Sequence, residues 1–313
     1  MAAKEIGGYF ELEHFHGLML HEDALALSCG RACIEYLLRQ KKIKKVLLPY
    51  FICDVVPESC AAAGAEVRYY HINSDFLPCD VDIQEDEWLY VVNFYGQLGR
   101  ADLEALVSTF SRVIVDNSHA YFDNPLKGVD TLYTCRKFFG VPDGGFLYTD
   151  APECDLPKDI SYGRMNFVLG RFEKSAGEFY AEASDNNDFF SGQPVKRMSA
   201  LTENILRAVD YEHVKSTRSR NFLQLHEALK DINLLSVRPV EGAYAYPLLI
   251  KDGMEKKKEL IAEKIFVPTL WPNVLKYARE NSLEYNFSAN ILPLPCDQRY
   301  GEAEMDRIIS FFK

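Results

Sequence analysis

The sequence lacks any run of apolar residues long enough to cross a membrane. A membrane-spanning helix needs about twenty such residues, and no stretch of that kind occurs among the 313 residues. The amino terminus, Met-Ala-Ala-Lys-Glu-Ile-Gly-Gly, also lacks the apolar centre of a signal peptide. We therefore expect a soluble, cytoplasmic protein without a membrane partner.

Positive charge and closely spaced metal ligands are also scarce. The 35 Lys and Arg residues are outnumbered by 46 Asp and Glu residues, and the net charge of −11 disfavours a nucleic-acid partner. The 8 cysteines are scattered along the sequence, as is typical of reduced thiols. The close pair Cys29 and Cys33 has no further Cys or His at the spacing of a zinc finger. His14, His16 and His21 lie in a segment that alternates polar and apolar residues like an exposed arm. We expect no metal site.

One lysine stands in an unusual place. Lys137 directly follows the apolar, β-rich run 131–135 and directly precedes Phe138 and Phe139. Desolvation in such surroundings lowers a lysine's pKa and frees its amine for a Schiff base. The alternative is an ordinary lysine that extends from a strand end into water.

An acid and a histidine come shortly before this lysine. The buried-type strand 111–116 ends in Asp116, and His119 follows. Bound pyridoxal phosphate needs an anion against its pyridinium nitrogen, and Asp116 could supply it. As alternatives, Asp116 could cap the next segment and His119 could be a hydrogen-bonded turn histidine.

The order of elements predicts the fold class. Expected strands alternate with helices, at 45–49, 55–63, 66–72, 87–94, 101–110 and 111–116. This alternation predicts a mainly parallel sheet with helices on both faces, where ligands bind beyond the carboxyl ends of the strands. The turn at Ser28, Cys29, Gly30 and Arg31 opens a helix and could hold a phosphate through its amides, or be an ordinary loop-to-helix junction.

The second half of the chain is less regular. Residues 150–198 show no clear periodicity, and a long amphipathic helix is expected from 199 to about 230, kinked near Lys215. A strand at 245–250, a helix ending at 264, the proline-rich segment 292–300 and a last helix at 302–312 follow. We expect a large domain at 1–232, with an arm at 1–20, and a small domain at 233–313.

Three motifs together resemble a known family. Asp116-Asn-Ser-His-Ala120 is similar to the pattern Asp-x-x-(Gln or His)-Ala, and Lys137 is followed by Asp143, Gly144 and Gly145 at the expected spacing. The stretch 28–33 is a looser counterpart of a Gly-Thr-x-Ala-Leu phosphate turn. In order and spacing they resemble fold-type I pyridoxal-phosphate aminotransferases, and among them the DegT/DnrJ/EryC1/StrS sugar aminotransferases. The resemblance covers nearly the whole chain from about Gly30.

The resemblance implies a fold and an activity. The fold would be α/β, with a mainly parallel seven-stranded-type sheet between helices and a small α+β carboxyl-terminal domain. The enzyme would use pyridoxal 5'-phosphate to move an amino group from an amino acid such as glutamate to a nucleotide-linked keto-sugar, in sugar or polysaccharide biosynthesis. It would be a homodimer with shared active sites. The alternatives are a sugar dehydratase, in which histidine usually replaces the lysine, and a non-catalytic regulatory or assembly protein.

The resemblance also implies roles for particular residues. Lys137 would be catalytic and would hold the cofactor, Asp116 would face the ring nitrogen, and His119 would flank the ring. Arg197 would reach the neighbouring subunit's phosphate from the motif 195–199, in which Val195 replaces the usual asparagine. The remaining expected cofactor contacts are Ser28, Cys29, Gly30, Arg31 and Thr134 at the phosphate and Phe51, or its neighbour Tyr50, against the ring.

Overall fold

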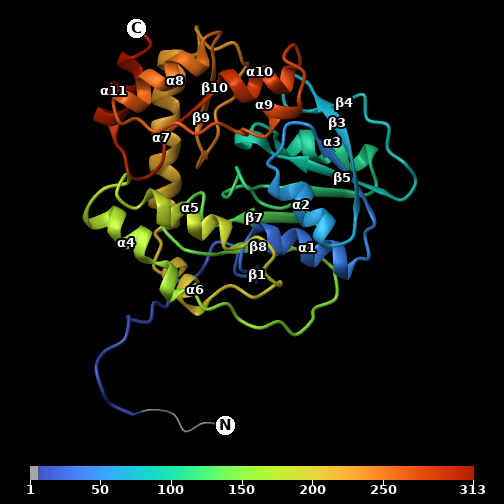
Figure 1. The fold of residues 1–313 in the computed structure, drawn as a ribbon, viewed down its shortest axis with the longest axis vertical. Helices are drawn as coiled ribbons and strands as arrows, with labels where there is room; N and C mark the ends of the chain where they lie inside the picture. The colour runs from blue at the N-terminus through green and yellow to red at the C-terminus, as the bar shows by residue number, and fades with distance from the viewer. Residues whose placement is uncertain (1–5) are drawn as a thin grey trace.

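A central β-sheet organises the computed structural model, which describes residues 6–313 (Figure 1). Its strands are β1 (Leu25–Leu27), β2 (Lys45–Pro49), β3 (Glu66–Ile72), β4 (Pro78–Cys79), β5 (Glu87–Val92), β6 (Val113–Asp116), β7 (Asp130–Thr134) and β8 (Gly145–Tyr148). They stand in the order β1-β8-β7-β6-β5-β2-β3-β4. The predicted α/β fold is confirmed, and the short β4 adds an eighth strand to the expected seven-stranded type.

Five neighbouring strands, β3, β2, β5, β6 and β7, pair in parallel. Strands covered on both faces bury nearly every residue, which explains the continuous apolar runs in the sequence. The register pairs Asp116 with both Val92 and Leu132. The carboxyl ends of β5, β6 and β7 therefore lie together at one edge of the sheet.

Helices cover this sheet and form a smaller layer at one end of the molecule (Figure 1). They are α1 (Gly30–Gln40), α2 (Val55–Ala62), α3 (Arg100–Thr109), α4 (Asn166–Glu173), α5 (Tyr180–Asp188), α6 (Ala200–Leu206), α7 (Tyr211–Leu229), α8 (Gly253–Ala262), α9 (Val274–Tyr277), α10 (Leu283–Asn290) and α11 (Glu302–Ser310). Short 3-10 helices lie at Phe94–Gly96 and Tyr162–Arg164. No helix within residues 6–313 is both long and apolar enough to span a membrane.

A second hydrophobic core lies around a two-stranded antiparallel sheet, β9 (Tyr246–Leu249) and β10 (Ile291–Leu294). The helices α8 and α11 pack on it, and Phe222 and Leu225 of α7 complete the core. Figure 1 shows α7 running from this group of elements toward the large sheet. The predicted division at residues 232 and 233 stays a prediction.

Two expectations about the second half were wrong. The region 150–198 contains α4 and α5 rather than only loop. The expected long helix is interrupted between α6 and α7 and not near Lys215, because Asp210 caps a new helix by accepting a hydrogen bond from the His213 amide (2.9 Å).

The described part of the amino-terminal arm extends away from the body before it joins β1 (Figure 1). The first five residues of the predicted arm lie outside the described residues. Nearer the body, the Phe15 amide donates to Asn204 (2.9 Å) and His21 is buried, bonded to the Tyr121 carbonyl (2.9 Å) and the Tyr148 hydroxyl (3.1 Å). His21 is thus a packing residue. In the part of the chain described, no group of His, Cys, Asp and Glu is placed to hold a metal ion.

Candidate active site

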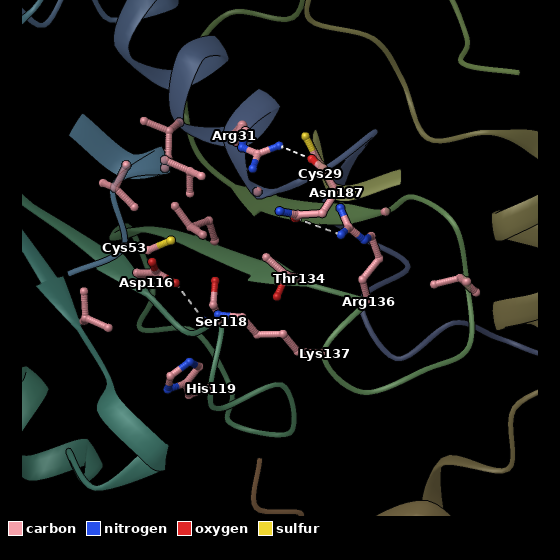
Figure 2. A pocket seen from close by; sticks show the side chains of 18 of the residues that line it. Cys29, Arg31, Cys53, Asp116, Ser118, His119, Thr134, Arg136, Lys137 and Asn187 are labelled. Atoms are coloured by element: carbon pink, nitrogen blue, oxygen red, sulfur yellow. Dashed lines mark hydrogen bonds between the residues drawn. The ribbon is translucent and has the colours of Figure 1, made fainter. Parts of the chain in front are cut away.

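A cavity of about 410 Å³ opens at the carboxyl edge of the parallel strands. Its walls come from the start of α1, the ends of β6 and β7, the loop before α2 with the first residues of that helix, and helix α5. Of the predicted site residues, seven line it: Cys29, Gly30, Arg31, Asp116, His119, Thr134 and Lys137. The structure therefore brings the lysine, the acid and the phosphate turn to one place, as Figure 2 shows.

Asp116 ends β6 and presents a buried carboxylate. It is 6% exposed, and it accepts hydrogen bonds from the Ser118 amide (2.8 Å) and the Tyr90 hydroxyl (2.8 Å). Both donors are neutral, so the negative charge is solvated but not cancelled. A carboxylate held in this way can keep a proton on a basic nitrogen that enters the cavity.

Lys137 follows β7 and extends into the open space of the cavity, which leaves its side chain exposed there. Protein atoms around that space desolvate the ammonium and lower its pKa, and the nearby Asp116 carboxylate opposes part of this shift. Its Nζ lies 5.9 Å from the ring centre of Tyr244. Lys137 is the group of this cavity best suited to act as a free amine.

His119 lies deeper, 1% exposed. The Tyr95 amide donates to its Nδ1 (3.4 Å), which places the ring proton on Nε2, and Nε2 has no hydrogen-bond partner. Burial and the Lys137 charge hold the pKa of His119 well below its usual value, so the ring is neutral. Tyr244 stacks on it at 4.4 Å and Trp271 lies nearly parallel at 5.8 Å. Two aromatic rings therefore lie against the imidazole, and its Nε2–H is left without a hydrogen-bond partner among residues 6–313.

The opposite end of the cavity suits an anion. Helix α1 begins at Gly30, its Cys29 cap gives no side-chain hydrogen bond, and its first turn contains no acid. The Thr134 hydroxyl is buried and has no partner. A Cβ on Gly30 would meet Thr134 Cγ2 at 2.8 Å, so only glycine leaves this space open. Free amides and a free hydroxyl converge here.

Three predicted site residues do not line the cavity. Ser28 is held by its backbone, which bonds Lys196 (2.9 Å) and Gly144 (2.6 Å). Phe51 is fully buried against Phe94 and Trp271 in the main core, so its side chain does not face the cavity as expected. The backbone of Arg197 bridges to Leu27 and to residue 158 at the edge of the fold. Its proposed reach into a neighbouring subunit stays a prediction.

The sequence analysis missed several residues of the cavity wall. Arg136 was passed over although it adjoins Lys137, and Asn187 lies in the region expected to be loop. Trp271 lies in the aromatic, proline-bounded segment 266–272, which the resemblance places near the active-site mouth without singling out this residue. Tyr244, stacked on His119, carried no sequence signal.

Comparisons with known proteins identify the fold. No protein-family model and no curated protein matches the chain. Solved structures do: DesV of S. venezuelae has a TM-score of 0.66 at 17% identity, with 92% of this chain and 83% of that chain covered. A DegT DnrJ EryC1 StrS aminotransferase from Brucella abortus has a TM-score of 0.62 at 16% identity, covering 92% and 84%.

The PLP-form of Spr1654 from Streptococcus pneumoniae, a proposed sugar aminotransferase, gives a third match. Its TM-score is 0.65 at 15% identity, with 93% of this chain and 86% of that chain covered. At such identities the likeness establishes the fold alone. The fold implied by the resemblance is confirmed.

Proposed function

We propose that this chain is a pyridoxal-phosphate-dependent aminotransferase of the DegT/DnrJ/EryC1/StrS type that aminates a keto-sugar. The observation that carries the proposal is the pairing of Lys137, whose pKa is lowered, with the buried Asp116 carboxylate across one cavity. The fold shared with proteins described as aminotransferases supports it. The nucleotide on the sugar and glutamate as amino donor remain part of the proposal.

The unpartnered polar atoms of the cavity fit this cofactor. The Thr134 hydroxyl and the α1 amides would hold its phosphate, Asp116 would face its ring nitrogen, and the free Nε2–H of His119 would donate to an oxygen on the ring. When bound, pyridoxal phosphate supplies the electron sink that lets an amino group leave one carbon for another. The donor set therefore matches the group at both ends.

The chain's own residues then have separate tasks. Asp116 keeps the proton on the ring nitrogen, because its charge is uncancelled by neutral donors. With the cofactor bound, the Lys137 amine would take the proton from the substrate's α-carbon and pass it to the cofactor carbon that bears the nitrogen, so that the amino group changes carrier. Neutral His119 holds an oxygen without competing for that proton.

The proposal is tested by whether pyridoxal phosphate becomes covalently attached to Lys137. Purified protein mixed with pyridoxal phosphate should develop a visible absorption band, and borohydride reduction should fix the cofactor's mass on the peptide that contains Lys137. Lys137→Ala should lose both signals and keep its circular dichroism spectrum. A band and a labelled peptide that persist in Lys137→Ala would assign the attachment to another lysine.

A second experiment separates this proposal from its two alternatives, a sugar dehydratase and a non-catalytic regulatory or assembly protein. The retained Lys137 favours amination over dehydration of the sugar, because dehydratases of this family usually carry histidine there. Incubation with amino acids should bleach the visible band if the chain accepts amino groups. A band that no amino acid changes would favour the regulatory or assembly protein instead.

A further inference from the structure

Two arginines from different elements meet at one residue above the cavity. Arg31, in the first turn of α1, donates to the backbone carbonyl of Asn187 (2.7 Å). Arg136, between β7 and Lys137, donates to the side-chain oxygen of the same Asn187 (3.1 Å). Figure 2 shows the two guanidinium groups on either side of Asn187, and all three residues line the cavity. Helix α5 thus fixes both cations.

Neither cation is neutralised by the protein. Among residues 6–313 no carboxylate pairs with Arg31 or Arg136, whereas Arg39, Arg164 and Arg207 each form an ion pair. The Asp143 charge acts favourably on Arg136, but Asp143 forms no ion pair with it and instead accepts hydrogen bonds from the Ser199 amide (2.8 Å) and hydroxyl (2.7 Å). Burial lowers the pKa of Arg136, and the Arg31 charge adds to this. Both guanidinium groups therefore line the cavity without a carboxylate partner of their own among the described residues.

The same end of the cavity offers further donors. The unpartnered Thr134 hydroxyl lies there with the free amides at the start of α1. Each guanidinium uses one hydrogen bond to Asn187 and keeps other N–H groups for a ligand. Two cations, a hydroxyl and backbone amides suit a doubly charged phosphate better than a carboxylate.

We propose that Arg31 and Arg136, held by Asn187, form a phosphate site within one chain, and that this site takes the phosphate of the cofactor without help from a neighbouring subunit. That the phosphate belongs to pyridoxal phosphate rests on the proposed function; that the site binds phosphate does not. Two details of the chain agree with a site that needs no neighbouring subunit. Val195, where an asparagine was expected, is buried in the main core, and Lys196 is paired with Asp159 (3.2 Å).

The experiment compares ligands with and without phosphate. Equilibrium binding of pyridoxal phosphate and of pyridoxal is measured for wild type, Arg31→Gln and Arg136→Gln, with Arg171→Gln on exposed α4 as matched control. Because a charge-assisted hydrogen bond is lost, each site variant should bind pyridoxal phosphate about ten- to a hundredfold more weakly and pyridoxal unchanged. Arg136→Lys should recover part of the loss. The control should bind both like wild type.

A second arm uses inorganic phosphate alone and follows thermal unfolding of the cofactor-free protein. Phosphate should raise the melting temperature of wild type and Arg171→Gln, and should do so much less in the two site variants. If this holds while pyridoxal phosphate never attaches to Lys137, the phosphate site stands and the proposed function fails. The site then serves a phosphate of another carrier.

Other results would overturn the site. Site variants that match wild type in both arms would remove the arginines from phosphate binding. If the site variants bound pyridoxal and pyridoxal phosphate with equally reduced affinity, the arginines would have only a structural role. Loss of the phosphate response in Arg197→Gln, with Arg31→Gln unaffected, would support the contact between subunits that the sequence predicted.

Discussion

Asp116 is the residue whose environment decides most of the proposed chemistry. Its two hydrogen bonds come from a backbone amide and from Tyr90, so a cation in the cavity would feel its full charge. Desolvation makes that charge effective, since the surrounding strand ends are buried.

Asp116→Asn should keep cofactor attachment at Lys137 but lower the rate of amino transfer about a hundredfold or more, because an amide cannot hold the ring proton by charge. Stopped-flow bleaching of the visible band by an amino donor measures this. Tyr90→Phe is the matched control: it removes one hydrogen bond from Asp116 and keeps the charge, so it should cost far less. Equal losses in the two variants would refute the electrostatic role.

His21 makes stability depend on pH. Burial lowers its pKa from 6.5 to about 4. Above pH 6.5 the ring is neutral in both the folded and the unfolded chain; between pH 6.5 and 4 only the unfolded chain takes up the proton, so stability falls as the pH falls. The total loss is about 3 kcal/mol. Urea unfolding of His21→Gln should show lower stability at pH 7 and less acid sensitivity across this range. Unchanged acid sensitivity would contradict the shift.

Among single residues, the sequence predicted the site residues that lie at or just after the ends of strands. Lys137, Asp116 and His119 each come just after a buried run, and parallel strands bring such positions to one edge. Phe51 was assigned to the wrong place because the sequence does not fix the register after β2. A shift of one residue there decides whether a side chain faces the core or the cavity. Asn187 could not be found, because nothing local indicates that α5 folds back over the cavity.

Elements differ in how much the sequence reveals. The parallel strands could be predicted because a strand that is buried on both faces consists of consecutive apolar residues in the sequence. Helix α4 was missed because none of its residues is buried, and α5 because it buries only Asn186. Without an apolar face a helix has no periodic signal. Ser199, assigned to a motif between subunits, caps α6 through the Thr202 amide (3.1 Å).

Helix α7 holds the segment that carries Lys137. Arg218 is 2% exposed and donates to the carbonyls of Ala243 (2.8 Å) and Phe138 (3.2 Å), and Gln298 also donates to Phe138 (2.8 Å). These bonds join the small-sheet end of the molecule to the residue next to the lysine. They fix the direction from which the lysine enters the cavity.

Arg218→Met should lower the free energy of unfolding by about 2–4 kcal/mol, because buried carbonyls lose their donors. Arg220→Met, on the exposed side of the same helix, should change it by less than about 0.5 kcal/mol. Denaturant unfolding of both variants provides the comparison. Similar stabilities of the two variants would show that the Arg218 bonds contribute little.

At the scale of the whole molecule, the arm presents apolar side chains that the chain's own body does not cover. Ile6, Tyr9 and Phe10 are 97%, 98% and 99% exposed, while the arm is fixed nearer the body by bonds between Asn204 and the backbone of Glu13 (2.8 Å) and Phe15 (2.9 Å). Large apolar groups held out in this way favour contact with another protein surface. A second copy of the chain is the partner that the proposed homodimer supplies.

We therefore expect a homodimer whose dissociation constant rises about tenfold or more in the double variant Tyr9→Ser with Phe10→Ser, because two buried aromatic side chains would be lost from the interface. Sedimentation velocity over a range of concentrations measures the constant. The exchange Tyr9→Phe with Phe10→Tyr keeps the apolar area, so it should dimerise like wild type. A wild-type protein that stays monomeric at micromolar concentration, or a serine variant that dimerises as tightly, would show that the arm does not join two copies.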